Sequence, residues 1–369
     1  MKDKIKNKII VISFLLVLFG FFFANLIAPD KELSYSERRP LAQMPEFSLA
    51  DIMSGEYMEA FDKYATDQFT GRETFRAIKT SFDRNILLKR DTNGLFQALG
   101  GIFSIEYPLR ENKVEQMCQR LNALYDKYLK DMNVYYSVVP DKNYYLPDNG
   151  SYLIMDYEKM AALMNEKMPE GAQYINLFGT LTLDNYYKSD AHWRQETLKP
   201  VVDALNEAMG GTNEFDPEEY EHKSYAPFYG VYYGQLAGTA KPDTITWLEN
   251  QTTSEAVVTD LAQPEKGNIH VYNEEGLGGM DSYDVFLHGA QPLITIENPH
   301  SSSKRELILV RDSYGSSLAP LLLESYSRIT LVDLRYVTQE LLAEYITFDK
   351  QDVLLLFSTT IINNSDTIR

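Results

Sequence analysis

The sequence has few cysteines and histidines and little positive charge, and each of these shortages limits the folds or functions open to the chain. Its single cysteine, Cys118, allows no disulfide within the chain and lies on an apolar helical stripe, where it is expected to fill core space. The fold must therefore rest on apolar packing, for which 44% hydrophobic content in 369 residues is sufficient. Lysine and arginine total 35 against 53 acidic residues, a net charge of −18. That charge repels nucleic acid, so we exclude it as a partner.

The one long apolar run lies at the N-terminus. Residues 9–28 are almost entirely Ile, Val, Leu and Phe, and twenty residues at 1.5 Å each span roughly 30 Å, the thickness of a bilayer core. Lysines precede the run, which predicts a cytoplasmic N-terminus and an extracellular main domain. The alternative is a cleaved signal peptide, but the run exceeds a usual signal h-region. We therefore expect residues 1–28 to form a single-pass anchor in the cell membrane and residues 29–54, broken by prolines, to form a stalk.

Helical and β patterns alternate through most of the remaining chain. Residues 55–90 are helical with a break at Gly71. We then predict strands over 134–139, 174–178, 306–310, 328–334 and 352–357, and helices over 111–132, 157–168, 194–209, 315–326 and 337–346. This alternation predicts one α/β domain, residues 55–369, with a mostly parallel sheet between helices. Residues 210–299 are interpreted as an aromatic insertion, whose rings serve either sugar stacking or core packing.

Asp190 and His192 are spaced for acid–base chemistry. In an extended segment, side chains two residues apart point to the same side, so Asp190 would orient the His192 ring and leave Nε2 free as a base. With five histidines in the chain, this pair is the candidate to weigh. The alternative is that Ser189 or Asp190 caps the predicted helix over 194–209, with Trp193 packing beneath it.

A serine lies where a predicted strand gives way to a helix. The hydroxyl of Ser313 would project over the sheet edge beside the first free N–H groups of that helix. The alternative is again capping, by Asp312 or Ser313, without chemistry. Because α/β sheets bind ligands at the carboxyl ends of their strands, Ser313 is expected to meet the earlier pair. In this hypothesis Asp190 orients, His192 acts as the base and Ser313 attacks.

Two more residues are candidates for substrate binding. Lys142 follows the predicted strand over 134–139 and would meet an acidic sugar or hold the site; the alternative is a solvated lysine at the strand end. Trp193, beside His192, is the second candidate.

Several motifs occur together along the chain. They are Asp190-Ala191-His192-Trp193, Asp312-Ser313-Tyr314-Gly315, Ser36-Glu37-Arg38-Arg39-Pro40-Leu41-Ala42, Tyr64-Ala65-Thr66-Asp67-Gln68-Phe69 with Arg72, Pro140-Asp141-Lys142, Tyr283-Asp284-Val285-Phe286-Leu287-His288-Gly289 and Val332-Asp333-Leu334-Arg335-Tyr336. This set resembles the DHHW proteins, relatives of the alginate O-acetylation proteins with an SGNH-hydrolase-like domain. The resemblance implies a three-layer SGNH-like fold, a triad of Asp190, His192 and Ser313, and oxyanion contacts from the backbone of Ser313 and Gly289.

The sequence departs from the DHHW pattern at three places. Ala191 stands where the first histidine of the family name is expected. Ala290 follows Gly289 and Ser316 follows Gly315, where asparagine is expected at both positions. A lost side-chain amide removes one oxyanion donor, worth on the order of 3 kcal/mol of barrier.

The resemblance implies an extracytoplasmic O-acetyltransferase that modifies a cell-surface or exported polysaccharide through acetyl-Ser313. Because acetyl-CoA is not available outside the membrane, it also implies a membrane-bound O-acyltransferase as acetyl donor, and no cofactor or metal of the chain's own. Two alternatives stay open. A carbohydrate acetyl esterase would use the same triad with water as acceptor. A non-catalytic glycan-binding or assembly protein would have a degenerate site, for which Ala290 and Ser316 argue.

Overall fold

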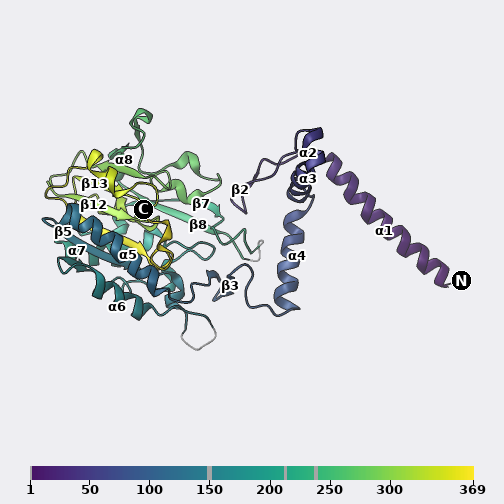
Figure 1. Cartoon of the computed structure of the whole chain (residues 1–369), viewed down its shortest axis with the longest axis horizontal. Coiled ribbons are helices and arrows are strands. Elements are labelled where there is room, and N and C mark those ends of the chain that lie inside the picture. The colour runs from purple at the N-terminus through teal and green to yellow at the C-terminus, as the bar shows by residue number, and fades with distance from the viewer. Residues whose placement is uncertain (1, 148–151, 212–213, 237–239) are drawn as a thin grey trace. The chain divides into compact units, whose positions relative to one another are not determined.

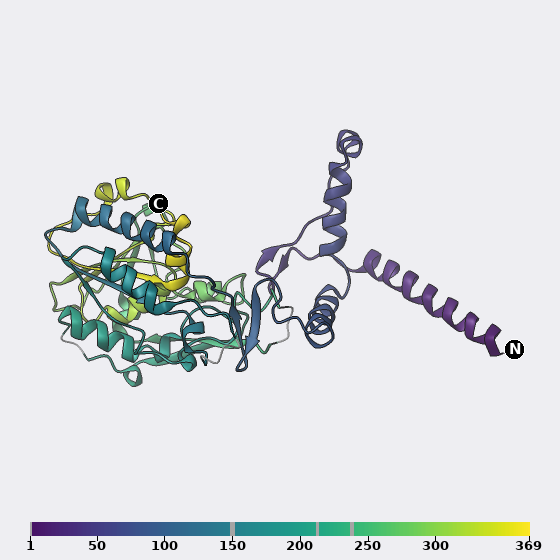
Figure 2. The ribbon, with the colours of Figure 1, turned by 60° about the horizontal axis from the view of Figure 1, so that its bottom comes forward.

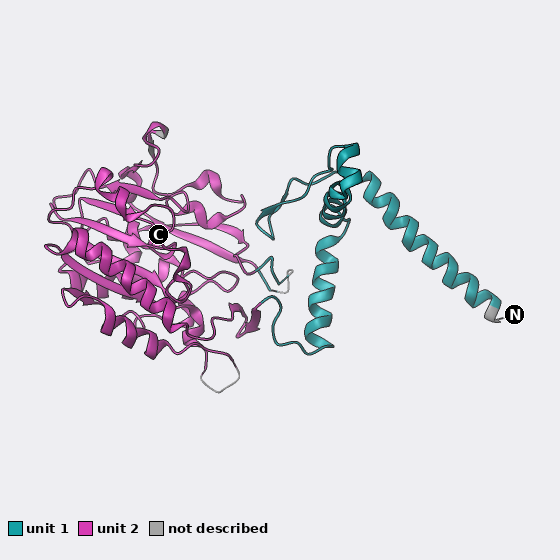
Figure 3. Ribbon diagram, in the orientation of Figure 1, with its two compact units in different colours: residues 1–93, 233–241 teal, residues 94–232, 242–369 magenta. Residues whose placement is uncertain are grey.

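The computed structural model describes residues 2–147, 152–211, 214–236 and 240–369, which form two compact units (Figures 1 and 3). Unit 1 comprises Met1–Asn93 and Tyr233–Lys241, and unit 2 comprises Gly94–Tyr232 and Pro242–Arg369. The division between these units falls at residue 93, so the helices that follow the expected stalk belong to unit 1. Ion pairs hold these helices to the segment before them. Arg39 binds Asp67 at 2.6 Å and Arg72 binds Glu37 at 2.8 Å, which tie the first helices to the preceding segment.

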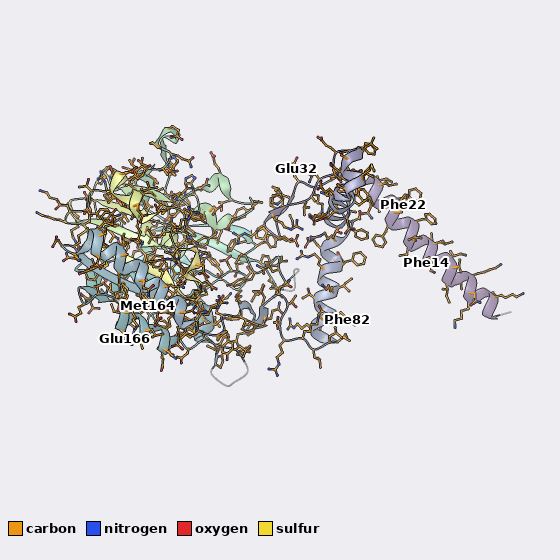
Figure 4. The ribbon with its side chains drawn as sticks, in the orientation of Figure 1. Phe14, Phe22, Glu32, Phe82, Met164 and Glu166 are labelled. Carbon is orange, nitrogen blue, oxygen red and sulfur yellow. The ribbon has the colours of Figure 1, made fainter. Side chains whose placement is uncertain are left out.

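Unit 1 begins with the apolar helix α1, and its remaining elements are short. Helix α1 is long and apolar enough to cross a membrane, and none of the residues in that apolar window is buried inside the protein. Figure 4 labels Phe14 and Phe22 on it. The elements of unit 1 are α1 (Lys2–Ile27), β1 (Leu33–Ser34), β2 (Arg39–Pro40), α2 (Leu49–Ser54), α3 (Glu56–Asp67) and α4 (Arg72–Asn85). The break predicted at Gly71 is confirmed, because Gly71 has a φ of 80° directly before α4. The region expected as a stalk contains the β1–β2 pair and α2.

Unit 2 is built on an eight-stranded sheet. Its spatial order is β10 (Asn268–Ile269), β9 (Val257–Asp260), β11 (Leu293–Glu297), β13 (Arg328–Val332), β12 (Glu306–Arg311), β14 (Asp352–Ser358), β5 (Asn133–Val139) and β6 (Ala172–Tyr174). The strands from β13 to β6 are parallel, whereas β10, β9 and β11 are antiparallel to their neighbours. All of β14 is buried, as expected for a central parallel strand with an apolar sequence.

Helices cover both faces of this sheet (Figure 2). Successive residues of β12 belong to different cores: Leu307 and Leu309 pack in one, Ile308 and Val310 in the other. The helices are α5 (Glu111–Leu124), continued as a π-helix over Tyr125–Leu129, α6 (Tyr157–Lys167), α7 (Lys199–Met209), α8 (Gln251–Glu255), α9 (Tyr314–Leu318), α10 (Leu342–Tyr345) and α11 (Thr359–Asn363). The predicted three-layer α/β fold with a mostly parallel sheet is confirmed.

Residues 210–299, interpreted from the sequence as an aromatic insertion, contribute strands to the main sheet. Three strands from this region, β9, β10 and β11, extend the main sheet. Antiparallel strands need no crossover helix, so the alternating pattern did not reveal them. The region also contains the hairpin β7 (Glu221–Phe228) and β8 (Asp243–Glu249), and a second small hairpin is formed by β3 (Leu95–Ala98) and β4 (Gly101–Ser104). The strand predicted over 174–178 lies earlier, and the helices predicted over 194–209 and 315–326 are shorter than expected.

Candidate active site

Ser313 lies between the end of β12 and the start of α9, at the edge of the sheet. The Asp312 carboxylate accepts hydrogen bonds from the backbone N–H of Tyr314 at 3.1 Å and of Ser358 at 2.7 Å. Asp312 therefore caps the turn and fixes it against the end of β14. Because Asp312 takes that role, the Ser313 hydroxyl is not used as a cap and stays partly exposed.

His192 connects Ser313 to a buried carboxylate. Its Nε2 lies 2.7 Å from Ser313 Oγ, and its Nδ1 lies 2.6 Å from Asp190 Oδ1. Because an ionised carboxylate can only accept hydrogen bonds, the contact with Asp190 places the ring proton on Nδ1, which leaves Nε2 to accept from the serine hydroxyl. The Asp190 side chain is fully buried and that of His192 is 16% exposed. The structure thus brings Ser313 to a pair that lies more than a hundred residues earlier in the chain, with 121 positions between His192 and Ser313. The arrangement is suited to deprotonating a serine.

The segment that carries this pair is a tight loop and does not cap a helix. An isolated bridge pairs Tyr186 with Trp193, and the Tyr187 N–H donates to His192 O at 3.1 Å. Helix α7 begins at Lys199, several residues further on, so neither Ser189 nor Asp190 is its cap. The Asp190 carboxylate instead accepts the His192 N–H at 3.0 Å, which sets the turn between the two residues.

The backbone of residues 230–232 also holds this loop in place. Val231 N–H donates to Asp190 Oδ2 at 2.7 Å, and Tyr232 N–H donates to Ser189 O at 3.1 Å. Gly230 makes this approach possible, because a Cβ there would lie 2.3 Å from Ser189 O. Sequence reasoning missed Gly230; its partners lie 41 residues away.

Two tyrosines hold the histidine ring. Tyr283 stacks on His192 with ring centroids 3.9 Å apart, and Tyr314 lies 4.9 Å away while donating its hydroxyl to Ala191 O at 2.7 Å. Burial raises the pKa of Tyr283, so the ring beside His192 stays neutral. Both tyrosines belong to motifs singled out in the sequence, but neither was proposed as a site residue. Their position restricts the imidazole to the orientation that serves Ser313.

Trp193 lies behind the site. It is fully buried, and its indole N–H donates to Ser317 Oγ at 2.8 Å. The same hydroxyl accepts from Tyr283 at 2.9 Å. Trp193 therefore braces α9 and the stacked tyrosine, and as a fully buried side chain it has no surface to offer a substrate.

Lys142 is buried and holds a loop of the site, so it is not a solvated lysine at a strand end. Its side chain is buried, and Nζ donates to the carbonyl oxygens of Tyr187 at 3.0 Å, Lys188 at 3.3 Å and Asp190 at 2.7 Å. The rings of Phe103 and Tyr232 lie 5.0 and 5.1 Å from the ammonium. Burial lowers the pKa of Lys142 to about 7, although nearby carboxylates favour the charged form. Lys142 holds the Asp190 loop and is not placed to meet a sugar.

Gly289 does not offer the oxyanion contact that the resemblance implies. Its N–H donates to Phe286 O at 3.1 Å, inside its own turn. It has a φ of 79°, and a Cβ would lie 2.2 Å from Asp284 Oδ1, so glycine is required. The N–H of Ser313 itself has no acceptor among the described residues, and it remains the candidate donor. At the two positions where the DHHW pattern has asparagine, Ala290 is exposed and Ser316 is buried in α9.

A buried ion network supports the strand that ends at Ser313. Arg311 is fully buried, and its guanidinium lies 3.3 Å from Asp333, which also accepts two bonds from Arg335. Burial lowers the pKa of Arg311, while Asp333 opposes that shift. Gly315 leaves room for this arginine, because a Cβ there would lie 2.7 Å from Arg311 Cβ.

Comparisons with known proteins agree with the fold. No family model matches the chain, and no curated protein matches it significantly. A DHHW family protein from Eubacterium siraeum is similar in structure, with a TM-score of 0.62 and 20% identity over 75% of this chain and 95% of that one. Bacillus cereus PatB1, also solved with a sulfonyl adduct, gives a TM-score of 0.57 at 17% identity over 73% and 96%. The O-acetyltransferase domain of Pseudomonas putida AlgJ reaches 0.46 at 14% identity over 73% and 92%, too low to argue from. The resemblance to the DHHW proteins is thus confirmed for the fold.

Proposed function

We propose that the chain is an extracytoplasmic O-acetyltransferase that acts on a cell-surface or exported polysaccharide through an acetyl-Ser313 intermediate. The observation that carries the proposal is the continuous chain of hydrogen bonds from Ser313 through His192 to the buried Asp190. The acetyl group and the polysaccharide come from the resemblance to the DHHW proteins. The apolar helix α1 supports a membrane location.

The chemistry takes two balanced steps. Ser313 Oγ bonds to the acetyl carbonyl carbon of a donor ester, its proton passes to His192 Nε2, and the donor alcohol leaves with that proton. A sugar hydroxyl then attacks the acetyl-serine and gives its proton to Nε2, and Ser313 regains a proton when its bond to the acetyl group breaks. Asp190 stabilises the imidazolium in both steps, and the Ser313 N–H is placed to meet the oxyanion.

The acetyl donor in this proposal is a membrane-bound O-acyltransferase, with which α1 would share the bilayer. Lys142 was expected either to meet an acidic sugar or to hold the site, and Trp193 was a candidate for substrate binding. In this account both act as positioning residues, because both are buried. With Gly289 bonded in its own turn, the acceptor surface has to come from exposed residues around Ser313 and His192.

Product analysis of the full chain in detergent, given an activated acetyl ester and oligosaccharide acceptors, separates the alternatives. We expect acetylated oligosaccharide to exceed free acetate, with neither formed by Ser313→Ala beyond background. Acetate alone would replace the transferase with an acetyl esterase. No product from a folded chain would favour the non-catalytic binding or assembly protein, for which the engaged N–H of Gly289 is the structural argument.

A further inference from the structure

The turn between α3 and α4 packs against the end of the apolar helix α1. The Phe21 ring lies 5.5 Å from those of both Phe69 and Phe75, which are 5.7 Å from each other. The Asn25 side chain accepts the Thr70 N–H at 2.7 Å. Aromatic packing and a backbone hydrogen bond thus fix this turn to the last turns of α1.

This contact places the turn at membrane depth if α1 crosses the bilayer. Phe21 precedes Ile27, the last residue of α1, by six residues, a distance of about 9 Å along the helix axis. The rings of Phe69 and Phe75 are therefore held beside a part of α1 that belongs to the apolar span. Phenylalanine is among the residues that interfacial helices bury at the boundary between lipid headgroups and acyl chains.

An uncovered apolar row continues from this cluster along α4. Phe75, Ile78, Phe82 and Ile86 recur at intervals of three and four residues, which puts them on one face of the helix. Their exposed fractions run from 46% to 64%, so other residues of the chain leave this face open. Phe82 is labelled near the far end of α4 in Figure 4. A row of this size on a soluble surface would be a liability, which indicates that something covers it.

Lysine and arginine side chains lie beside the apolar row of α4, although the net charge of the chain is strongly negative. A hollow of about 480 Å³ is lined by Arg76, Lys79, Lys89 and Arg90, against the acids Asp83 and Asp91. Lys89 pairs with Asp83 at 3.1 Å and Arg76 pairs with Glu37 and Glu73. Lys79 and Arg90 have no ion-pair partner within the described part of unit 1. Unpaired cations beside an apolar face are the pattern of helices that lie on anionic lipid surfaces.

We propose that the α3–α4 turn and the apolar row of α4 lie in the headgroup and upper acyl region of the bilayer, with Lys79 and Arg90 facing anionic lipid headgroups. This inference rests on α1 crossing the membrane, as in the proposed function, and does not depend on catalysis. The chain then has two membrane contacts. The second restricts how unit 1 tilts against the bilayer, because α4 cannot leave the surface without exposing its aromatic row to water.

The test uses the full chain in vesicles of phosphatidylcholine with phosphatidylglycerol. An environment-sensitive fluorophore is attached at Phe82→Cys, and at Arg84→Cys as the matched control, since two residues turn a helix by about 200°. Cys118 can remain, because it is buried and burial raises the pKa of its thiol to about 12. We expect lipid-borne nitroxides to quench the probe at position 82 and aqueous iodide to quench the probe at position 84.

Three results would overturn the proposal. Iodide quenching at both positions would show that the row faces water. Shielding of position 82 from both quenchers would mean that a protein surface, a second copy or a partner, covers it. Release of the chain by alkaline washing would remove the anchor on which the inference depends. Ser313→Ala should leave the quenching unchanged, so a failed acetylation assay does not affect this result.

A double substitution tests the contact of Lys79 and Arg90 with anionic headgroups. Lys79→Glu with Arg90→Glu should reduce the ratio of docked to free α4 by at least about five-fold for each lost cation at low salt. The effect should vanish in vesicles of phosphatidylcholine alone. An equal loss in both kinds of vesicle, or no loss in either, would contradict a role for anionic headgroups.

Discussion

Replacing Gly230 with alanine should disturb the candidate active site while Asp190, His192 and Ser313 all keep their own side chains. The new Cβ would lie 2.3 Å from Ser189 O and 2.5 Å from Asp190 Cβ, so the backbone has to retreat by roughly 1 Å to reach ordinary contact. That retreat breaks the bond from Val231 N–H to the buried Asp190 carboxylate. Losing a hydrogen bond to a buried charge costs about 1.5–3 kcal/mol, and a 1 Å misplacement lowers reactivity by about 100-fold.

Two measurements check this expectation. Thermal unfolding should show a Tm lowered by about 3–10 °C, and an activated acetyl ester or a sulfonyl fluoride should label Ser313 roughly 100-fold more slowly. Gly179→Ala is the matched control, because no atom lies within 4 Å of its Cβ position. If Gly230→Ala melts and reacts like the unaltered protein, the 230–232 segment does not position Asp190 and the argument from close approach is wrong.

Three further predictions concern the supporting residues. Burial lowers the pKa of Lys142 to about 7 from its ordinary 10.5, so between these pH values the unfolded chain binds more protons than the folded one. The free energy of unfolding should therefore rise with pH across that window, by at most about 1.4 kcal/mol per pH unit from this group. Lys142→Met should abolish this contribution in denaturant titrations at several pH values. Asp190→Asn should slow acylation of Ser313 by about 10⁴-fold in stopped-flow labelling, because the His192 tautomer is lost, while leaving the fold intact by circular dichroism. Asp333→Asn should destabilise the protein by about 3–5 kcal/mol in urea unfolding, because it removes the ion-pair partner of the buried Arg311. A small change would show that the remaining carboxylate, Asp312, balances the charge of Arg311.

The parallel half of the sheet and the meeting of Ser313 with His192 could be predicted from local patterns. Each parallel strand is an apolar run followed by a helix, and the carboxyl ends of such strands share one edge by geometry. The antiparallel strands β9, β10 and β11 could not be predicted in the same way. They are short, and the pairing of β11 with β13 and of β9 with β11 depends on contacts between segments far apart in the chain.

The surroundings of the triad were harder to predict for the same reason. Lys142 follows a strand in a charged motif, which suggests solvent exposure, yet three carbonyl oxygens from a loop 45–48 residues away surround its ammonium group. Trp193 was expected to bind substrate and is instead buried against α9. The Gly289 N–H was expected to be free, but its own turn uses it. The catalytic roles of Asp190, His192 and Ser313 stay predictions, because geometry alone does not establish a reaction.

The central claim, that Ser313 is an activated nucleophile, is tested most directly by intact mass spectrometry of the full chain after brief exposure to an activated acetyl ester. The account predicts a gain of about 42 Da in the unaltered protein and in Ser254→Ala, an exposed serine on α8, but not in Ser313→Ala. Equal labelling of the Ser313→Ala variant, or no labelling of a folded unaltered chain, would contradict it.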